Sequence, residues 1–136
     1  MRRGLMLLSM IGALSGCAAL GAPGCGPEGQ PQTVAELVFG RNIGDSLGVS
    51  EADWNRFLEE EVTPRFPDGL TVMSASGQWR DTERGVIVQE PSKLLVLVLG
   101  DEGQDRKRVA EIATAYKQRF QQQSVLTMMR QACVSF

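Results

Sequence analysis

The feature that most constrains the fold is an almost wholly apolar run at residues 93–99 (KLLVLVL). A run of Leu and Val this long is typical of a strand in the middle of a sheet, buried on both faces or nearly so. The chain has 136 residues, of which 43% are apolar, so it can form one compact domain around such a strand. The sequence therefore predicts a single domain built on a sheet.

The residues on either side of this run predict the rest of the fold. Apolar spacing, capping residues and turn residues predict strands at 34–41, 70–79 and 124–134 and helices at 51–63 and 104–121. Pro91 is expected to separate the run from a short strand at 86–88. The order β-α-β-β-α-β predicts an α+β, ferredoxin-like domain with a four-stranded antiparallel sheet and two helices on one face. The first and third strands then lie in the middle, and the polar second strand lies at an edge.

Two helices of this length cover only one face of such a sheet. The other face is solvated, covered by loops, or paired with a second copy of the chain. The apolar residues available for such a second layer are Met73, Val98, Val125, Met128 and Met129. We therefore expect a homodimer.

The beginning of the chain has the pattern of an export signal. Arg2 and Arg3 precede an apolar stretch at residues 4–14 that is too short to span a bilayer as a helix. Residues 14–17 (LSGC) then resemble the lipobox of bacterial lipoproteins, which implies cleavage of a signal peptide at residues 1–16 and lipidation of Cys17. The other interpretation is an ordinary secretory signal that is cut nearby, with no role for Cys17.

The lipobox resemblance also implies a location. It implies a diacylglycerol and an amide-linked acyl chain such as palmitate on Cys17, and more than one chain gives stable anchoring. Ala18 stands where an Asp would imply retention in the inner membrane, so the outer membrane, facing the periplasm, is expected. Residues 17–32, rich in Ala, Gly, Pro and Gln, are expected to form a flexible tether, and residues 33–136 the folded domain.

Two further cysteines, Cys25 and Cys133, would then lie in a compartment that permits disulfides. An intramolecular bridge would fix the end of the tether to the last strand. The alternatives are a buried free Cys133 with an exposed Cys25, or pairing of Cys25 with another chain. The sequence leaves these alternatives open.

Composition excludes several classes of function. The chain has no histidine, which excludes the HExxH metalloprotease pair and every triad that contains histidine. The chain has 14 basic and 16 acidic residues, so it lacks the basic excess of a nucleic-acid-binding domain. We expect no metal, no cofactor and no nucleic acid.

The candidate ligand-binding residues are Gln78, Trp79, Arg80, Glu90, Lys93 and Tyr116. The first three end the second strand and the next two open the third, so a hairpin would bring them together. Together they could hold a small anionic or planar ligand, with Arg80 as a bidentate clamp and Trp79 as a stacking wall. In the alternative interpretation Glu90 pairs with Arg80 across the strands and Trp79 is part of the core. Tyr116 is expected to pack on the apolar face of the second helix, with its hydroxyl at the rim.

Several stretches occur in a characteristic order between residues 34 and 136. They are VAELVFGRNIG, TPRFPDGLTV, GQWRD, EPSK, YKQRFQQQSVL and CVSF. In this order they resemble a family of small secreted bacterial proteins, many with lipoprotein signals, whose shared domain of unknown function has no assigned activity. The resemblance therefore implies no catalytic residue.

These observations favour a lipid-anchored extracytoplasmic domain, attached to a membrane through Cys17, that binds a protein partner or a small ligand. The alternative is a cofactor-free enzyme of the isomerase or oxygenase type, with a pocket at a ferredoxin-like dimer.

Overall fold

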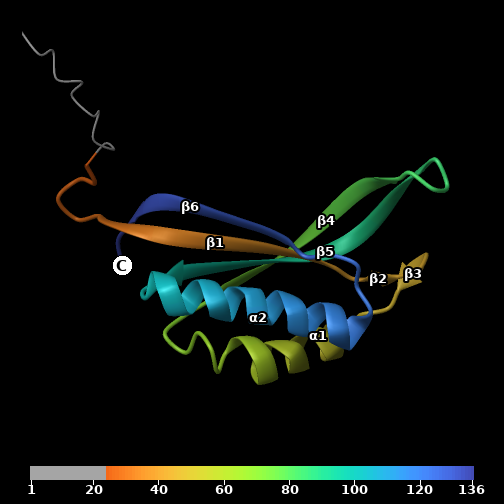
Figure 1. The fold of residues 1–136 in the computed structure, drawn as a ribbon, viewed down its shortest axis with the longest axis horizontal. Coiled ribbons are helices and arrows are strands. Elements are labelled where there is room, and N and C mark those ends of the chain that lie inside the picture. Colours follow the sequence, from red (N-terminus) through yellow and green to blue (C-terminus); the bar gives the residue numbers. More distant parts are fainter. Residues whose placement is uncertain (1–23) are drawn as a thin grey trace, which may run out of the picture.

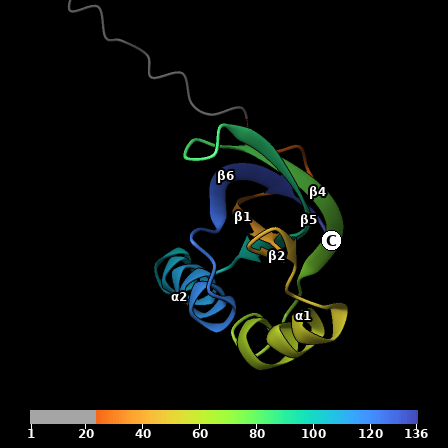
Figure 2. The ribbon, with the colours of Figure 1, turned by 90° about the vertical axis from the view of Figure 1, so that its right-hand side faces the viewer.

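The computed structural model describes residues 24–136. A four-stranded antiparallel sheet of order β4-β5-β1-β6 carries two helices on one face, as Figures 1 and 2 show. This confirms the α+β class and the ferredoxin-like arrangement. The elements are β1 (Gln30–Gly40), β2 (Asn42–Ile43), β3 (Ser46–Leu47), α1 (Glu51–Phe57), the π-helical turn η1 (Leu58–Val62), β4 (Thr71–Asp81), β5 (Val86–Leu99), α2 (Glu102–Phe120) and β6 (Leu126–Val134).

The apolar run lies in the middle of the sheet, in β5, between β1 and β4. Leu95 and Leu97 face the helices and are almost fully buried, because strand residues alternate between the two faces of a sheet. Val96 and Val98 face the other side and are only half-buried. The run is therefore covered completely on one face only, and the opposite face of the sheet is open.

An aromatic cluster joins the helices to the covered face of the sheet. Phe39 of β1 packs against Tyr116 of α2 at a ring-centroid distance of 4.7 Å and against Trp54 of α1 at 5.2 Å. Phe57 of α1 lies 5.1 Å from Tyr116. Ser50 starts α1, since its hydroxyl accepts a hydrogen bond from the Asp53 backbone N–H. This cap positions the two aromatic residues of α1 toward the sheet.

Pro91 does not interrupt the third long strand, which was expected to begin after it. Pro91 pairs with Ser76 of β4, and its carbonyl accepts a hydrogen bond from the Arg41 backbone N–H at 3.1 Å. In an antiparallel strand the N–H and C=O of one residue point to the same side. The ring nitrogen of Pro91, which carries no hydrogen, therefore faces the β1 side, beyond the last residue of β1. Its lack of an N–H removes no hydrogen bond to β4.

Two further boundaries differ from the expected ones. The helix predicted at 51–63 is α-helical only to Phe57, and the Thr63 N–H then bonds to the Leu58 carbonyl as the chain approaches Pro64. The loop predicted after the first strand contains the small β2–β3 hairpin. Its Gly44 has a φ of 64°, a backbone conformation that favours glycine.

The apolar residues expected to form a second layer divide between the two faces. Met73, Val98 and Met128 lie on the open face by their strand register, and Met73 and Met128 are exposed. Val125 and Met129 instead pack against the buried core, because the register of β6 turns Met129 toward the helices beside Ala35.

A disulfide joins Cys25 to Cys133, with the two Cα atoms 5.4 Å apart. The sequence left three alternatives open for these cysteines, and the structure contains the intramolecular bridge. The strand β1 begins at Gln30, so residues 30–32, which were expected to belong to the tether, pair with β6. The folded domain therefore begins earlier in the chain than expected.

The predicted signal peptide and Cys17 lie outside the described residues. Within residues 24–136, no helix is both long enough and apolar enough to span a membrane.

We expect loss of the Cys25–Cys133 bridge to lower the free energy of unfolding by up to about 4–5 kcal/mol, because the bridge closes a long loop in the unfolded chain. Urea denaturation of the oxidised and reduced protein measures this difference. The double variant C25S/C133S should unfold at the reduced protein's midpoint and should not respond to reductant. Equal midpoints for oxidised and reduced wild-type protein would contradict the prediction.

Candidate functional site

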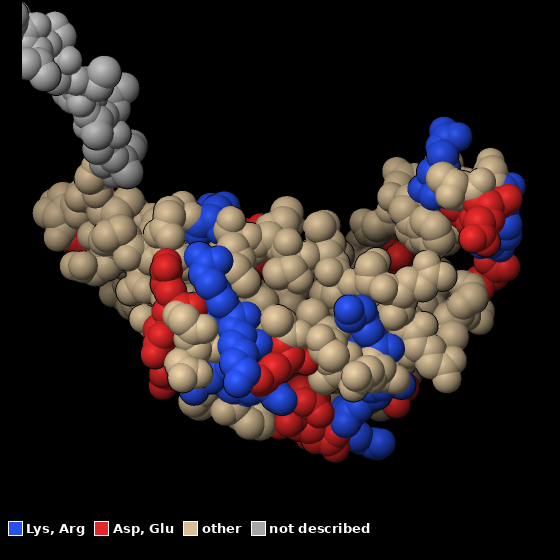
Figure 3. Space-filling view, viewed as in Figure 1, with Lys and Arg blue, Asp and Glu red and all other residues tan. Residues whose placement is uncertain are grey.

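The β4–β5 hairpin continues past the end of β1 and curves away from the helices (Figure 1). Between this raised hairpin and the body of the domain the surface is hollowed (Figure 3). The hollow is a cavity of about 570 Å³ that the β2–β3 hairpin and the segment at residues 121–124 also border. Its side chains include Asn42, Asp45, Gln78, Trp79, Asp81, Arg84, Glu90, Ser92, Gln122 and Leu126.

Three of the six candidate ligand-binding residues line this cavity: Gln78, Trp79 and Glu90. In the register of the hairpin, Trp79 lies opposite Val88 and Glu90 lies opposite Gly77, which places Trp79 and Glu90 on the same face. Trp79 is 46% exposed, so the interpretation that it belongs to the core is wrong.

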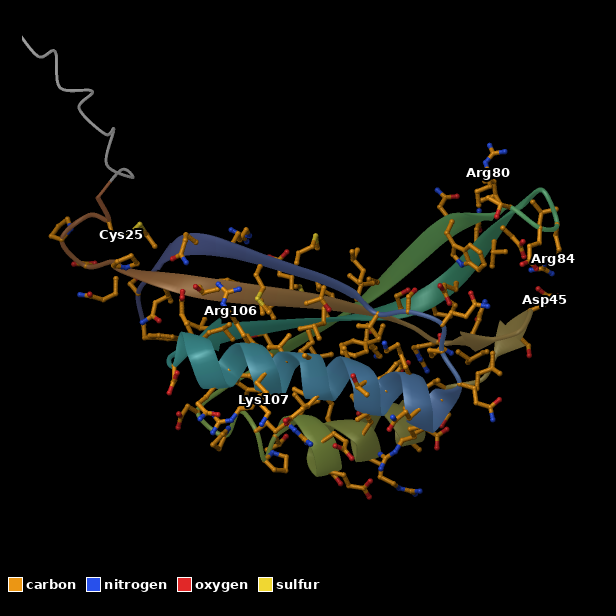
Figure 4. The ribbon with its side chains drawn as sticks, in the orientation of Figure 1. Cys25, Asp45, Arg80, Arg84, Arg106 and Lys107 are labelled. Carbon is orange, nitrogen blue, oxygen red and sulfur yellow. A yellow bond between two sulfur atoms is a disulfide. The ribbon has the colours of Figure 1, made fainter. Side chains whose placement is uncertain are left out.

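Arg80 does not form the expected clamp. It lies opposite Ile87, and its side chain points away from the cavity, as Figure 4 shows. Arg80 and Trp79 are successive residues of β4 and face opposite sides of the strand, and Arg80 is not among the side chains that line the hollow. The alternative pairing with Glu90 is absent as well, since no ion pair joins the two within the described part of the chain.

Lys93 lies on the helix side of the sheet, away from the cavity. Its ammonium contacts the Glu51 Oε2 atom at 2.9 Å and donates to the Ser74 hydroxyl at 3.0 Å. Arg41 contacts the other carboxylate oxygen of Glu51 at 2.6 Å. The hydrogen bond from Lys93, with help from Arg41, holds the pKa of Glu51 below its usual value. This ionic group ties α1 to the end of the sheet.

Tyr116 is fully buried, and its hydroxyl is not at a rim. The hydroxyl donates a hydrogen bond of 2.8 Å to the carbonyl of Gly40, the last residue of β1. Burial raises the pKa of Tyr116 well above its usual value. Tyr116 therefore supports the cavity from below as a hydrogen-bond donor.

Two glycines lie near Glu90, and one of them, Gly40, determines where its carboxylate rests. A Cβ atom at Gly40 would lie 2.6 Å from the Glu90 Oε2 atom, so the carboxylate rests against the bare backbone of β1. Gly77, opposite Glu90 on β4, has no side chain to fill the space beside it. The backbone N–H of Asn42 lies 3.4 Å from the same oxygen as a long hydrogen bond.

The sequence did not indicate the residues that close the outer end of the cavity. Arg84, in the turn of the raised hairpin, contacts Asp45 of the β2–β3 turn at 2.7 Å and Asp81 at 2.6 Å (Figure 4). Hydrogen bonds from the Arg84 backbone and side chain hold the pKa of Asp81 below its usual value. The side-chain amide of Gln122 donates to the Asn42 carbonyl at 2.7 Å. No local pattern links these residues, because 39 and 80 positions separate the partners.

The described residues contain no group of three or more His, Cys, Asp or Glu side chains placed to hold a metal ion. The cavity offers amides, hydroxyls, carboxylates and one exposed indole. Such a lining can bind a ligand by stacking and hydrogen bonds.

Comparisons with known proteins give a family and a fold. A family model described as a protein of unknown function (DUF3574) matches residues 34–136. No curated protein sequence matches the chain. Among solved structures, a phage SAM lyase in complex with S-methyl-5'-thioadenosine is similar, with a TM-score of 0.61 and 15% identity over 77% of this chain and 90% of that one. The phage SAM lyase in its apo state gives a TM-score of 0.58 at 15% identity, over 78% and 90% of the two chains. At this identity the likeness shows the fold alone.

Tyr116 is the chain's single tyrosine, so its ionisation can be followed by tyrosinate absorbance in the near ultraviolet. We expect no tyrosinate to form until the protein unfolds, because burial raises the pKa of Tyr116 in the folded state. The unfolded chain releases this proton near pH 10, so the free energy of unfolding should fall as the pH rises above that value. The absorbance change and the loss of circular dichroism should coincide. Tyrosinate absorbance in the folded protein near pH 10 would contradict this expectation.

Proposed function

We propose that this chain, which belongs to the DUF3574 family of proteins of unknown function, binds a small polar molecule with a flat ring in the cavity under the β4–β5 hairpin. The observation that carries the proposal is Trp79, a large aromatic side chain that is 46% exposed inside an amide-lined cavity. An exposed indole offers a broad stacking surface, and the groups around it can fix the orientation of a ligand.

The neutral polar groups of the cavity suit the edges of such a ring. Asn42, Gln78 and Gln122 carry amides that both donate and accept hydrogen bonds, and Ser92 adds a hydroxyl. A similar fold, that of the phage SAM lyase, holds S-methyl-5'-thioadenosine, a molecule with a flat purine ring. This likeness supports a trial of nucleosides as first probes.

An anionic ligand, which the sequence had also suggested, is no longer favoured. The proposed clamp, Arg80, points away from the cavity (Figure 4). Arg84 does line the cavity, but its guanidinium already forms ion pairs with the carboxylates of Asp45 and Asp81.

We expect adenosine or S-methyl-5'-thioadenosine to quench the tryptophan emission saturably, because a ring stacked on Trp79 alters the emission of the chain's exposed indole. Isothermal titration should show at least about tenfold weaker binding to W79A, since base stacking contributes about 1–3 kcal/mol. Trp54, which is buried in the core, supplies an unchanged background emission.

The matched control is I87A. Ile87 is 54% exposed on the same hairpin but lies on the face opposite to Trp79. The I87A variant should bind each nucleoside as the wild type does. Absence of binding by every nucleoside tested, or equal binding by W79A and wild type, would overturn the proposal.

We further propose that the domain is held at a membrane surface by lipids on Cys17, with the outer membrane as its site. The Cys25–Cys133 disulfide supports an extracytoplasmic location, because disulfides persist in oxidising compartments. The variant C17S should lose the acyl mass and move from the membrane fraction to the soluble periplasm. Retention of C17S in the membrane fraction would contradict the anchor.

The second candidate function is a cofactor-free enzyme whose pocket a second copy of the chain completes. Glu90 favours it, because no Lys or Arg side chain in the described residues pairs with this carboxylate, which could then take a proton from a ligand. The open face of the sheet beside the cavity carries the exposed apolar residues Leu126 and Met128. It also carries the ion pair Glu36–Arg130, and in a symmetric dimer each of these residues could pair with the oppositely charged residue of the second copy. Native mass spectra of ligand mixtures distinguish the candidates, since the enzyme predicts a dimer and product masses.

A further inference from the structure

We infer that the natural ligand of this cavity carries a positive charge, and that Glu90 and Trp79 together recognise the charged group. The inference rests on the proposed function and names the class of ligand: a small organic cation, such as a substituted ammonium, attached to a flat or apolar body. It follows from the charge balance of the cavity, from the surroundings of Glu90 and from the position of Trp79.

The charged side chains that line the cavity are unbalanced. Three are acidic, Asp45, Asp81 and Glu90, and one is basic, Arg84. Arg84 contacts both Asp45 and Asp81, so its single charge is shared between two carboxylates. The lining is therefore net negative, and a partly enclosed negative surface concentrates cations.

Glu90 is the carboxylate that the protein leaves most open to a ligand. Its one hydrogen-bond donor among the described residues is the Asn42 backbone N–H, at the long distance of 3.4 Å. An ionised carboxylate has about four acceptor positions on its two oxygens, so most of its capacity is unused. Gly77, directly opposite on β4, has no side chain, and a Cβ atom there would have only the Ser92 Oγ atom within 4 Å, so this part of the cavity is open to a ligand.

Trp79 lies two residues along β4 from Gly77, on the same face, and is therefore a diagonal neighbour of Glu90 across the hairpin. Diagonal neighbours in an antiparallel pair are within reach of aromatic and long side chains. The face of an indole attracts a cation, and Trp does so more strongly than Phe or Tyr. A ligand that lies across β5, between Trp79 on β4 and the Glu90 carboxylate beside Gly40, would therefore meet an aromatic ring and a carboxylate in the same cavity.

The test compares choline with 3,3-dimethyl-1-butanol, which has the same shape but a carbon atom in place of the charged nitrogen. Titration of the full-length protein, followed by NMR of the tryptophan indole signals, should show at least about tenfold weaker binding of the neutral probe. The variant E90Q, which keeps the shape of the side chain, should bind choline about as weakly as the neutral probe. The variant W79A should also weaken choline binding.

The matched control is E83Q, which removes one negative charge from the turn of the same hairpin. Glu83 is exposed and does not line the cavity, so E83Q should bind choline as the wild type does. Equal loss in E83Q and E90Q would overturn the inference, because general charge attraction would then explain the binding.

The remaining outcomes separate this inference from the proposed function. Equal binding of choline and its neutral analogue, or binding of nucleosides without binding of choline, would overturn the cationic ligand and leave the cavity as a site for neutral rings. Failure of both choline and the nucleosides would overturn both proposals.

Discussion

The cavity depends on a difference in length between neighbouring strands. The pairing of β1 with β5 ends at Gly40 and Ser92, whereas the pairing of β4 with β5 continues to Asp81 and Val86. Pro91 stands at this point and has no N–H with which to extend the sheet toward β1. The hairpin therefore leaves the plane of the sheet as a two-stranded ribbon, which twists more strongly than a wider sheet, and the hollow forms beneath it.

The end of β1 is held in place from the helix side of the sheet. The Tyr116 hydroxyl binds the Gly40 carbonyl, and Arg41 binds the Val49 carbonyl at 2.9 Å and the Glu51 carboxylate. Lys93 reaches the same carboxylate from β5. These contacts fix the backbone against which the Glu90 carboxylate rests, so residues that never touch a ligand determine the geometry of the cavity. The outer end depends instead on the exposed Arg84 ion pairs, which salt screens more readily.

Local pattern was sufficient for the sheet and for part of the site. The apolar run at residues 93–99 predicted a central strand, and the hairpin spacing brought Trp79 and Glu90 to one face. The same alternation rule places Arg80 on the opposite face. The sequence interpretation nevertheless grouped Arg80 with its neighbour Trp79. Pro91 was misinterpreted because its effect depends on which side of the strand has a partner. The contacts of Arg84 with Asp45 and of Gln122 with Asn42 had no sequence signal, because they join loops that are distant along the chain.

The sequence by itself determined the class of fold, the order of the elements and the chemistry that the chain lacks. Periodicity is a property of short segments and composition is a property of the whole chain, so neither depends on which segments meet in space. The tertiary structure decided which side chains share the hollow, since this depends on where β1 ends and on how far the β4–β5 hairpin extends beyond it. It also decided that Cys25 bonds to Cys133. Lys93 and Tyr116 do not line the cavity but hold the elements around it in place. Such contacts arise between segments far apart in the chain, where no local pattern restricts the choice of partner.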